Sequence, residues 1–158
     1  MKDKVAIIKS TTTRPMRNDG KDHLEYTFIT EEEFLMRKEG KKFVECPPRH
    51  GGNLYSLEKK TVSDVLERTH GICVLSEYGI RDLKGLGYLV RPIKITSVGN
   101  EKMRRDFYAN HPGREEADLE RSEIPIYYSR EIKNNFIEGE GGFMKAANEL
   151  ADFIRHFS

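Results

Sequence analysis

A set of side chains suited to binding an anion lies near the start of this 158-residue chain. The segment Ser10-Thr-Thr-Thr-Arg-Pro-Met-Arg17 joins hydroxyl side chains to two arginines that are three residues apart. Guanidinium groups present paired N–H donors that match phosphate oxygens, and the hydroxyls and amides of a turn add uncharged donors. We therefore expect Ser10, Arg14 and Arg17 to bind a phosphate, with Arg14 in an exposed loop. The alternative is that the arginines are ordinary solvated loop charges.

The strands that would position this set alternate with helices along the chain. Short apolar or alternating runs predict strands, and the fully apolar run at residues 72–75 is typical of a parallel sheet. Pro92 interrupts the last run, which places this proline at a sheet edge or a strand entry. The expected strands are Val5–Lys9, Tyr26–Ile29, Phe43–Cys46, Ile72–Leu75 and Leu89–Ile95.

Capping and terminating residues predict the helices. Thr30-Glu-Glu-Glu33 is a capping box, and Gly40 ends the helix that it opens. A second helix is expected from a cap at Thr61-Val-Ser-Asp64 to a terminator at Gly71. Two more are expected, a basic helix at Glu101–Tyr108 and an amphipathic one at Phe143–Phe157. The alternation predicts an α/β fold in one domain that spans residues 1–158.

Composition limits the classes of function. Twenty-seven basic and 26 acidic residues give a net charge of +1, which argues against a nucleic-acid surface built on bulk charge. No apolar run approaches the ~18 residues of a membrane span, so no membrane partner is expected. Cys46 and Cys73 stand in no paired motif. This favours reduced thiols, a cytoplasmic location and no metal site.

The anion-binding segment and the residues after it resemble the part of guanylate kinases that binds the nucleoside monophosphate. The interval from Arg17 to Tyr26 is the family's interval from its second arginine to its first phosphate-binding tyrosine. The family's register continues without a gap from Phe28 to Phe43. Gly52-Asn-Leu-Tyr55 resembles the family's Gly-Asn-Tyr-Tyr segment, which carries the second tyrosine. Beyond this part of the chain, the resemblance rests on the order of the elements and a few residues.

The resemblance implies a set of site residues. The implied phosphate ligands are Ser10, Arg14, Arg17, Tyr26 and Tyr55. Glu45 falls on the glutamate that accepts hydrogen bonds from guanine in the family. The family's Asp-x-Asp-x-Gln-Gly segment is altered here, so that its aspartate is replaced by Ser76 or Glu77. Arg121 falls on an arginine of the family's lid.

The resemblance also implies a fold. It is a three-layer α/β domain with a mostly parallel sheet, of the P-loop nucleoside-monophosphate-kinase type without the P-loop. The core sheet would hold Val5–Lys9, Ile72–Leu75 and Ile93–Ile95. A small strand-rich lobe over about residues 20–60 would bind the nucleotide, and a lid-like segment would lie at about residues 100–122.

The chemistry of these residues agrees with a guanine mononucleotide. Two arginines can neutralise the nearly two negative charges of a monophosphate, and tyrosine hydroxyls add donors without charge. Guanine presents two adjacent N–H donors that one carboxylate can accept, and adenine lacks this pair. Glu45 therefore predicts a preference for guanine, because the wrong base would leave buried polar groups unpaired. As a bland alternative, Tyr26 and Tyr55 could be aromatic residues at the edge of the core.

One part of the family's machinery has no counterpart in the sequence. No Gly-x-x-x-x-Gly-Lys-Ser/Thr motif, which holds the phosphates of ATP, occurs among the 158 residues. Only nine residues precede Ser10, which leaves no room for such a loop before it. We therefore expect no catalytic residues in this chain, and neither ATP nor Mg²⁺ bound in the family manner.

Three functions stay open on this basis. The chain could bind a guanine mononucleotide without phosphorylating it, as a pseudoenzyme. It could instead bind phosphoserine or acidic peptides, as the guanylate-kinase-like domains of scaffold proteins do. It could also be an active ATP:GMP phosphotransferase whose donor site is supplied by another chain or by an unrecognised loop. A homo-oligomer is possible, because an unpaired inner edge of the sheet would favour association. A base-reading carboxylate at Glu45 favours the first function over the second, and the missing phosphate loop weighs against the third.

Overall fold

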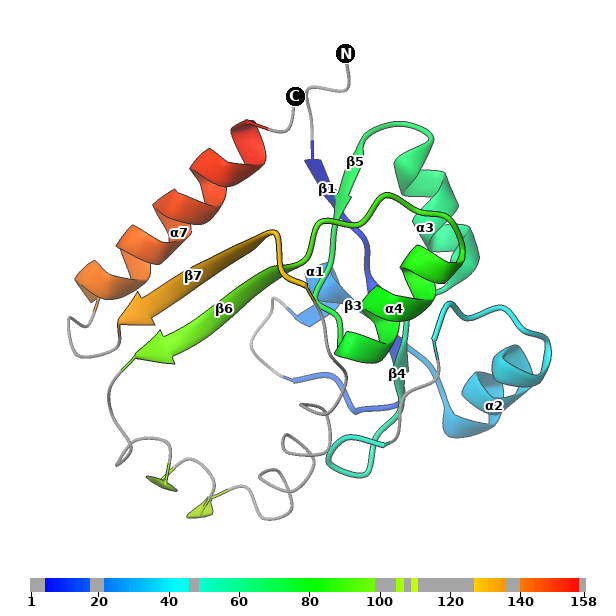
Figure 1. Cartoon of the computed structure of the whole chain (residues 1–158). Helices are drawn as coiled ribbons and strands as arrows, with labels where there is room; N and C mark the ends of the chain where they lie inside the picture. Colours follow the sequence, from blue (N-terminus) through cyan, green and yellow to red (C-terminus); the bar gives the residue numbers. More distant parts are fainter. Residues whose placement is uncertain are drawn as a thin grey trace.

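Two parallel pairs of strands and a three-stranded sheet form the sheet structure of the described residues (Figure 1). The computed structural model describes residues 5–17, 22–45, 49–98, 105–106, 109–110, 127–135 and 140–156. In the first pair, β1 (Val5–Ile7) runs parallel to β5 (His70–Ile72). Both strands were expected, although β5 begins earlier and ends earlier than the apolar run at residues 72–75.

The three-stranded sheet carries most of the expected phosphate ligands. β2 (Ser10–Thr12) lies in its middle, parallel to β3 (Tyr26–Phe28) and antiparallel to β4 (Tyr55–Ser56). The short helix α1 (Asp22–Glu25) leads directly into β3. This sheet is the frame on which the candidate site is built.

The expected strand at Phe43–Cys46 is wrong over its described residues, 43–45. Phe43 makes an isolated antiparallel bridge to Glu58 and does not belong to a strand. The Val44 N–H still donates to the Leu57 carbonyl at 2.8 Å, and the Glu45 carbonyl accepts the Ser56 hydroxyl, which is a side-chain contact and not a ladder hydrogen bond.

The second parallel pair joins β6 (Ile93–Val98) to β7 (Arg130–Asn135) over six residues in register. The expected strand at Leu89–Ile95 therefore begins only after Pro92, because proline has no N–H to donate to a sheet. The amphipathic C-terminal helix was expected, and it is found as α7 (Glu140–Arg155), which lies along β7 (Figure 1).

Within the described residues the two parallel pairs are separate sheets, which differs from the single core sheet that was expected. Residues 93–95 pair with β7 and not with β1 or β5. β7 was missed because its sequence, Arg-Glu-Ile-Lys-Asn-Asn, holds one apolar residue and no alternating pattern. The mixed α/β class with parallel strands is confirmed, and the three-layer arrangement stays a prediction.

The capping box correctly predicted α2 (Glu31–Glu39). Thr30 caps this helix by accepting a hydrogen bond from the Glu33 N–H at 3.2 Å, and Gly40 follows its last residue. The expected cap at Thr61 is wrong, because α3 (Lys59–Leu66) starts two residues earlier. The Glu58 carbonyl already accepts the Val62 N–H, which places Thr61 inside the first turn.

Two further differences concern helix ends. α3 ends at Leu66, so Gly71 lies in β5 and does not terminate a helix. α4 (Glu77–Gly85) was not predicted, and Ser76 caps it by accepting from the Gly79 N–H. The basic helix expected at residues 101–108 lies mostly outside the described residues. Within that range the structure describes residues 105 and 106, and both are helical.

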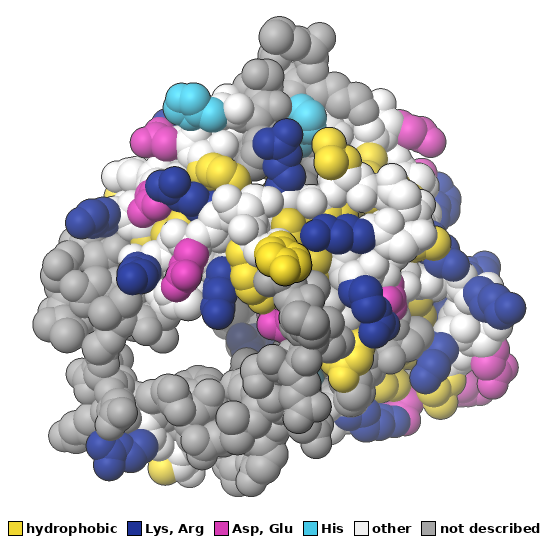
Figure 2. Space-filling model, viewed as in Figure 1, with side chains coloured by type: hydrophobic (Ala, Val, Ile, Leu, Met, Phe, Trp, Pro, Cys, Tyr) yellow, Lys and Arg dark blue, Asp and Glu magenta, His cyan; other side chains and the backbone are white. Residues whose placement is uncertain are grey.

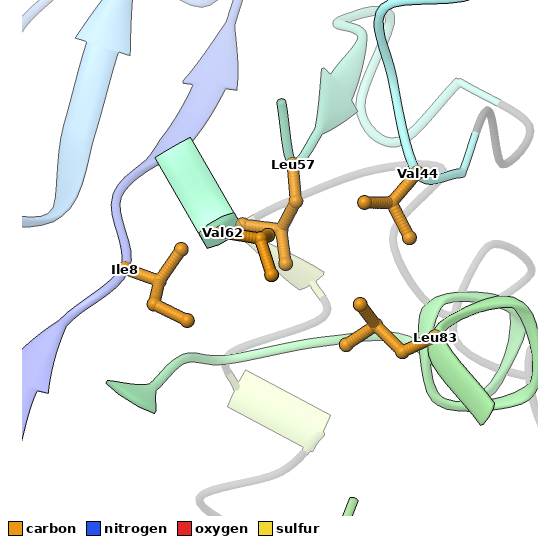
Figure 3. Packing of buried hydrophobic residues seen from close by; sticks show 5 residues of the cluster. All are labelled: Ile8, Val44, Leu57, Val62 and Leu83. Carbon is orange, nitrogen blue, oxygen red and sulfur yellow. The ribbon is translucent and has the colours of Figure 1, made fainter. Parts of the chain in front are cut away.

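The hydrophobic core lies between β1, α3 and α4. Its buried members converge as Figure 3 shows, and they are Ile8, Val44, Leu57, Val62 and Leu83. Leu57 is fully buried and directly follows β4, whereas Ile8 stands just before β2. The core therefore anchors two strands of the three-stranded sheet from their ends.

The surface carries mixed charge. On the face shown in Figure 2, basic and acidic side chains are interspersed, as the net charge of +1 suggests. Among the described helices, none combines the length and the apolar character that crossing a membrane requires.

Candidate functional site

The register of the three-stranded sheet gathers the expected phosphate ligands. Ser10 pairs with Tyr26 across β2 and β3, and Thr12 pairs with Tyr55 across β2 and β4. The rings of Tyr26 and Tyr55 meet edge to face, with their centroids 6.2 Å apart. The guanidinium carbon of Arg14 lies 5.2 Å from the centre of the Tyr26 ring, within the range of a cation–π contact. Arg14, Tyr26 and Tyr55 thus come together at the end of β2.

Thr12 and Thr13, which directly precede Arg14, both form hydrogen bonds to the backbone of Leu54, the residue before β4. The Thr12 hydroxyl donates to the Leu54 carbonyl at 3.0 Å and accepts the Arg14 N–H at 3.1 Å. The Thr13 hydroxyl accepts the Leu54 N–H at 3.0 Å. Both hydroxyls form hydrogen bonds with backbone groups, and these bonds fix the position of Arg14 relative to Tyr55.

Arg14 itself is a nearly buried side chain, so its expected place in an exposed loop is wrong. Its side chain is 12% exposed and makes an ion pair with Asp22, whose side chain is 6% exposed. The distance from Arg14 Nη2 to Asp22 Oδ1 is 2.6 Å, and Arg14 Nη1 donates to the Pro15 carbonyl. The ion pair and the packing on Tyr26 and Phe28 together remove Arg14 from solvent.

Asp22 brings Arg17 into the same cluster. The Arg17 N–H donates to Asp22 Oδ2 at 2.7 Å, and its exposed guanidinium is near enough to act on the Asp22 carboxylate. The hydrogen bond from Arg14 lowers the pKa of Asp22, and the same bond raises the pKa of Arg14. Sequence reasoning missed Asp22, because it stands in a polar run without any spacing that marks it. The Arg14 guanidinium thus already pairs with a carboxylate of the chain itself.

The Tyr26 hydroxyl stays protonated near neutral pH and can therefore donate a hydrogen bond. Burial, followed by the nearby Glu25 carboxylate, raises the pKa of Tyr26.

Tyr55 follows a tight turn in which Gly51 and Gly52 have φ angles of 55° and 79°, a region that favours glycine. Hydrogen bonds in both directions between His50 and Asn53 close this turn. The turn sets the point at which Tyr55 enters β4.

Glu45 forms a second cluster, at the start of α4. Its side chain belongs to a residue that is 6% exposed, and its Oε2 accepts the Ser76 hydroxyl at 3.3 Å. The Ser56 hydroxyl donates to the Glu45 carbonyl, and Ser56 directly follows Tyr55 in β4. A carboxylate at a helix N-terminus is favoured by the helix dipole. The strand that holds Tyr55 thus also holds the backbone of Glu45.

Cys73 lies close enough to Glu45 for the carboxylate to affect the pKa of its thiol. Burial raises the pKa of the Cys73 thiol to about 11, and the Glu45 carboxylate adds to this effect. The thiol is therefore protonated at neutral pH. Cys46, the other cysteine, lies outside the described residues.

The structure separates the two candidates for the replaced aspartate. Ser76 contacts Glu45, whereas the Glu77 carboxylate accepts a hydrogen bond from the Tyr128 hydroxyl at 3.3 Å. Burial, and then Glu77, raises the pKa of Tyr128. Ser76 is thus the residue beside the Glu45 carboxylate. Arg121 lies outside the described residues.

The partly exposed carboxylate of Glu58 joins α2 to the three-stranded sheet. The Glu58 carboxylate accepts hydrogen bonds from Thr11 on β2, at 3.0 Å, and from Arg37 on α2. Arg37 also pairs with Glu33 one turn earlier. As for metals, no group of three or more His, Cys, Asp and Glu side chains in the described ranges could hold an ion.

Comparison with known proteins matches this chain to one family. The family described as guanylate kinase matches residues 1–139. A guanylate kinase of Thermotoga maritima is 42% identical over 65 residues, which cover 39% of this chain and 31% of that protein. The crystal structure of guanylate kinase from Anaplasma phagocytophilum superposes with a TM-score of 0.65 at 22% identity, covering 96% of this chain and 75% of that one. The matched part is thus about a third of the length of the Thermotoga protein.

Proposed function

Because the chain belongs to the guanylate kinase family, we propose that it binds a guanine mononucleotide and does not itself transfer a phosphoryl group. The observation that carries this proposal is the convergence of Arg14, Tyr26 and Tyr55. The Asp22 carboxylate already pairs with the Arg14 guanidinium there. In the proposal, Ser10 and Arg17 complete the phosphate site, and Glu45 with Ser76 reads the base.

At the phosphate end, Arg14 keeps donors for a ligand. A guanidinium has five N–H donors. Within the described part of the chain, one goes to Asp22 and one to the Pro15 carbonyl. In the proposed complex, the remaining three donors bind the phosphate together with the Tyr26 and Tyr55 hydroxyls. Asp22 is then an orienting partner, because it holds Arg14 in one place before a phosphate arrives.

At the base end, burial gives Glu45 its discriminating power. A carboxylate that is nearly removed from water must find hydrogen-bond donors, because leaving it unpaired is costly. Ser76 supplies one donor at 3.3 Å. Guanine would supply two more through its adjacent N–H groups, and adenine would supply none in that place. A phosphopeptide has no use for such a buried carboxylate, which is why the nucleotide reading is preferred.

At the donor end, the 158 residues contain no Gly-x-x-x-x-Gly-Lys-Ser/Thr motif. Phosphoryl transfer depends almost entirely on positioning and on electrostatic stabilisation of the moving group. Without the backbone cradle and the lysine of such a loop, this chain has no described means to hold the triphosphate. We therefore propose binding without catalysis by this chain.

Calorimetric titration with GMP, dGMP, AMP and a phosphoserine peptide tests the function. GMP and dGMP should bind, and AMP should bind much more weakly than either. Equal binding of GMP and AMP would remove the base-reading role of Glu45. Binding of the phosphoserine peptide in preference to all three nucleotides would assign the anion cluster to peptide recognition.

A further inference from the structure

Gly79 occupies a place where a side chain would collide with the base-reading carboxylate. It is the third residue of α4, and its N–H faces the Ser76 hydroxyl. A Cβ atom built on Gly79 would lie 2.1 Å from Glu45 Oε2 and 2.7 Å from Glu45 Cδ. It would also lie 2.9 Å from Leu75 Cδ2. All three distances are shorter than real Cβ contacts, so the Glu45 carboxylate lies against the bare backbone of the helix.

The backbone conformation does not explain this glycine. The glycines with positive φ angles among the described residues are Gly51, Gly52 and Gly87, and Gly79 is helical. A glycine inside a helix costs about 1 kcal/mol relative to alanine. Gly85, in the same helix, shows the contrast, because nothing lies within 4 Å of the Cβ that it would carry. The close approach of Glu45 is therefore the feature that distinguishes Gly79.

The helix position makes this approach specific. The third position of a helix is where a capping box places its own glutamate. In α4 that position is empty of side chain, and a glutamate from elsewhere in the chain, Glu45, lies there beside the capping Ser76. The atoms that an alanine would meet are the ends of flexible side chains. The expected response to alanine is therefore a displaced carboxylate in a folded protein.

We propose that Gly79 is a positioning residue that sets where the Glu45 carboxylate stands and thereby sets the selectivity for guanine. This inference rests on the proposed function, in which Glu45 reads the base. Ordinary contact begins near 3.4 Å, so an alanine would force the carboxylate back by about 1 Å. Displacements of about 1 Å are enough to weaken a site whose hydrogen bonds need fixed geometry.

The test compares the wild-type chain, Gly79→Ala and Gly85→Ala by titration with GMP, IMP and AMP. IMP keeps one of guanine's two N–H donors, and AMP keeps the shared ribose phosphate but neither donor. In Gly79→Ala, the GMP affinity should fall about tenfold or more, the scale of one lost hydrogen bond to a charged group. The affinity for IMP should fall less than the affinity for GMP. The affinity for AMP should be unchanged, because the variant leaves the cluster of Arg14, Tyr26 and Tyr55 intact. Gly85→Ala should behave as the wild type.

The outcomes separate this inference from the proposed function. If the wild type prefers GMP and Gly79→Ala keeps that preference, the inference is overturned and the proposed function stands. If the wild type shows no preference for GMP, both are overturned. If Gly79→Ala does not fold, the double variant Gly79→Ala/Glu45→Ala decides. Recovery of folding supports the contact with Glu45, and continued failure overturns it.

Discussion

Arg14 is held from two sides before any ligand arrives. Its guanidinium lies against Tyr26 and Phe28 and pairs with Asp22, so it is both stacked and hydrogen-bonded. A guanidinium held in this way loses little freedom when it binds a phosphate. The same contacts mean that Arg14 also stabilises the fold around it.

Truncation of Arg14 should therefore affect both binding and stability. Arg14→Ala should weaken GMP binding by roughly 2–3 kcal/mol, the scale of a lost charge-assisted contact. It should also lower the melting temperature, because it leaves the nearly buried Asp22 carboxylate without its guanidinium. Arg155→Ala is the matched control, since Arg155 is an exposed arginine on α7 that pairs with Asp152. Equal GMP binding by the two variants would remove Arg14 from the site.

Asp22 predicts a specific loss of stability in acid. Arg14 lowers the pKa of Asp22 in the folded chain below the ordinary value of about 4. The ionised carboxylate therefore stabilises the fold fully above about pH 4, and this contribution is lost as the pH falls through the lowered pKa. The melting temperature of the wild type should therefore fall more steeply below about pH 4 than the melting temperature of Asp22→Asn. Parallel pH profiles would show that the pair contributes nothing to the acid response.

Glu45 and Glu77 can be distinguished by matched amide variants. Glu45→Gln keeps the size of the side chain but puts an NH₂ donor where guanine needs an acceptor. The ratio of GMP to AMP affinity should fall about tenfold or more, while AMP binding changes little. Glu77→Gln should leave the ratio unchanged, because Glu77 accepts from Tyr128. A fall of the ratio in Glu77→Gln alone would transfer the base-reading role to that residue.

At the scale of elements, short strands and capped helices position these side chains. Each strand of the β3-β2-β4 sheet has two or three residues, so its place depends on what flanks it. The Glu58 carboxylate joins β2 to α2 through Thr11 and Arg37. The start of α3 and the end of α2 are therefore part of the support of the site.

The two candidate caps give a paired test of this support. Thr30 caps α2, so Thr30→Ala should cost about 1 kcal/mol of unfolding free energy. Thr61 lies inside the first turn of α3, where alanine has the higher helix propensity, so Thr61→Ala should cost much less. Chemical denaturation measures both. A larger loss in Thr61→Ala would mean that α3 begins where the local sequence pattern placed its cap.

At the scale of the whole molecule, the two clusters of the candidate site lie in one part of the described fold. The three-stranded sheet carries the cluster of Arg14, Tyr26 and Tyr55, and the start of α4 carries the cluster of Glu45 and Ser76. The two parallel pairs, β1–β5 and β6–β7, carry neither cluster. This chain covers 75% of the comparison structure, so a quarter of that structure lies outside the match.

The 158-residue chain should therefore show no phosphoryl transfer from ATP to GMP. The parts that position and stabilise a moving γ-phosphoryl group have no motif in its sequence. A coupled assay for ADP formation, run with the chain at high concentration, should remain at background. Turnover near the ~1–100 s⁻¹ of ordinary kinases would contradict this and would require a donor site that the sequence does not reveal.

Local patterns determined what depends on neighbouring residues. The capping box at Thr30 predicted α2, and the 3.6-residue period predicted α7, because both signals act within a few positions. The spacing from Arg17 to Tyr26 pointed to one anion site, and the structure places Arg14 against Tyr26 and beside Tyr55. The family itself followed from these intervals, and the match over residues 1–139 confirms it.

Tertiary structure alone decided the contacts between distant residues. Glu45 and Ser76 are 31 positions apart, so no local pattern shows that Ser76, beside Gly79, faces the carboxylate. The partner of Arg14 was also hidden, because an aspartate in a polar run has no periodic signal. β7 was missed for the same reason, since a buried Ile132 among polar residues becomes a strand only when β6 lies beside it. Sequence thus determined the chemical types available, and packing decided which of them meet.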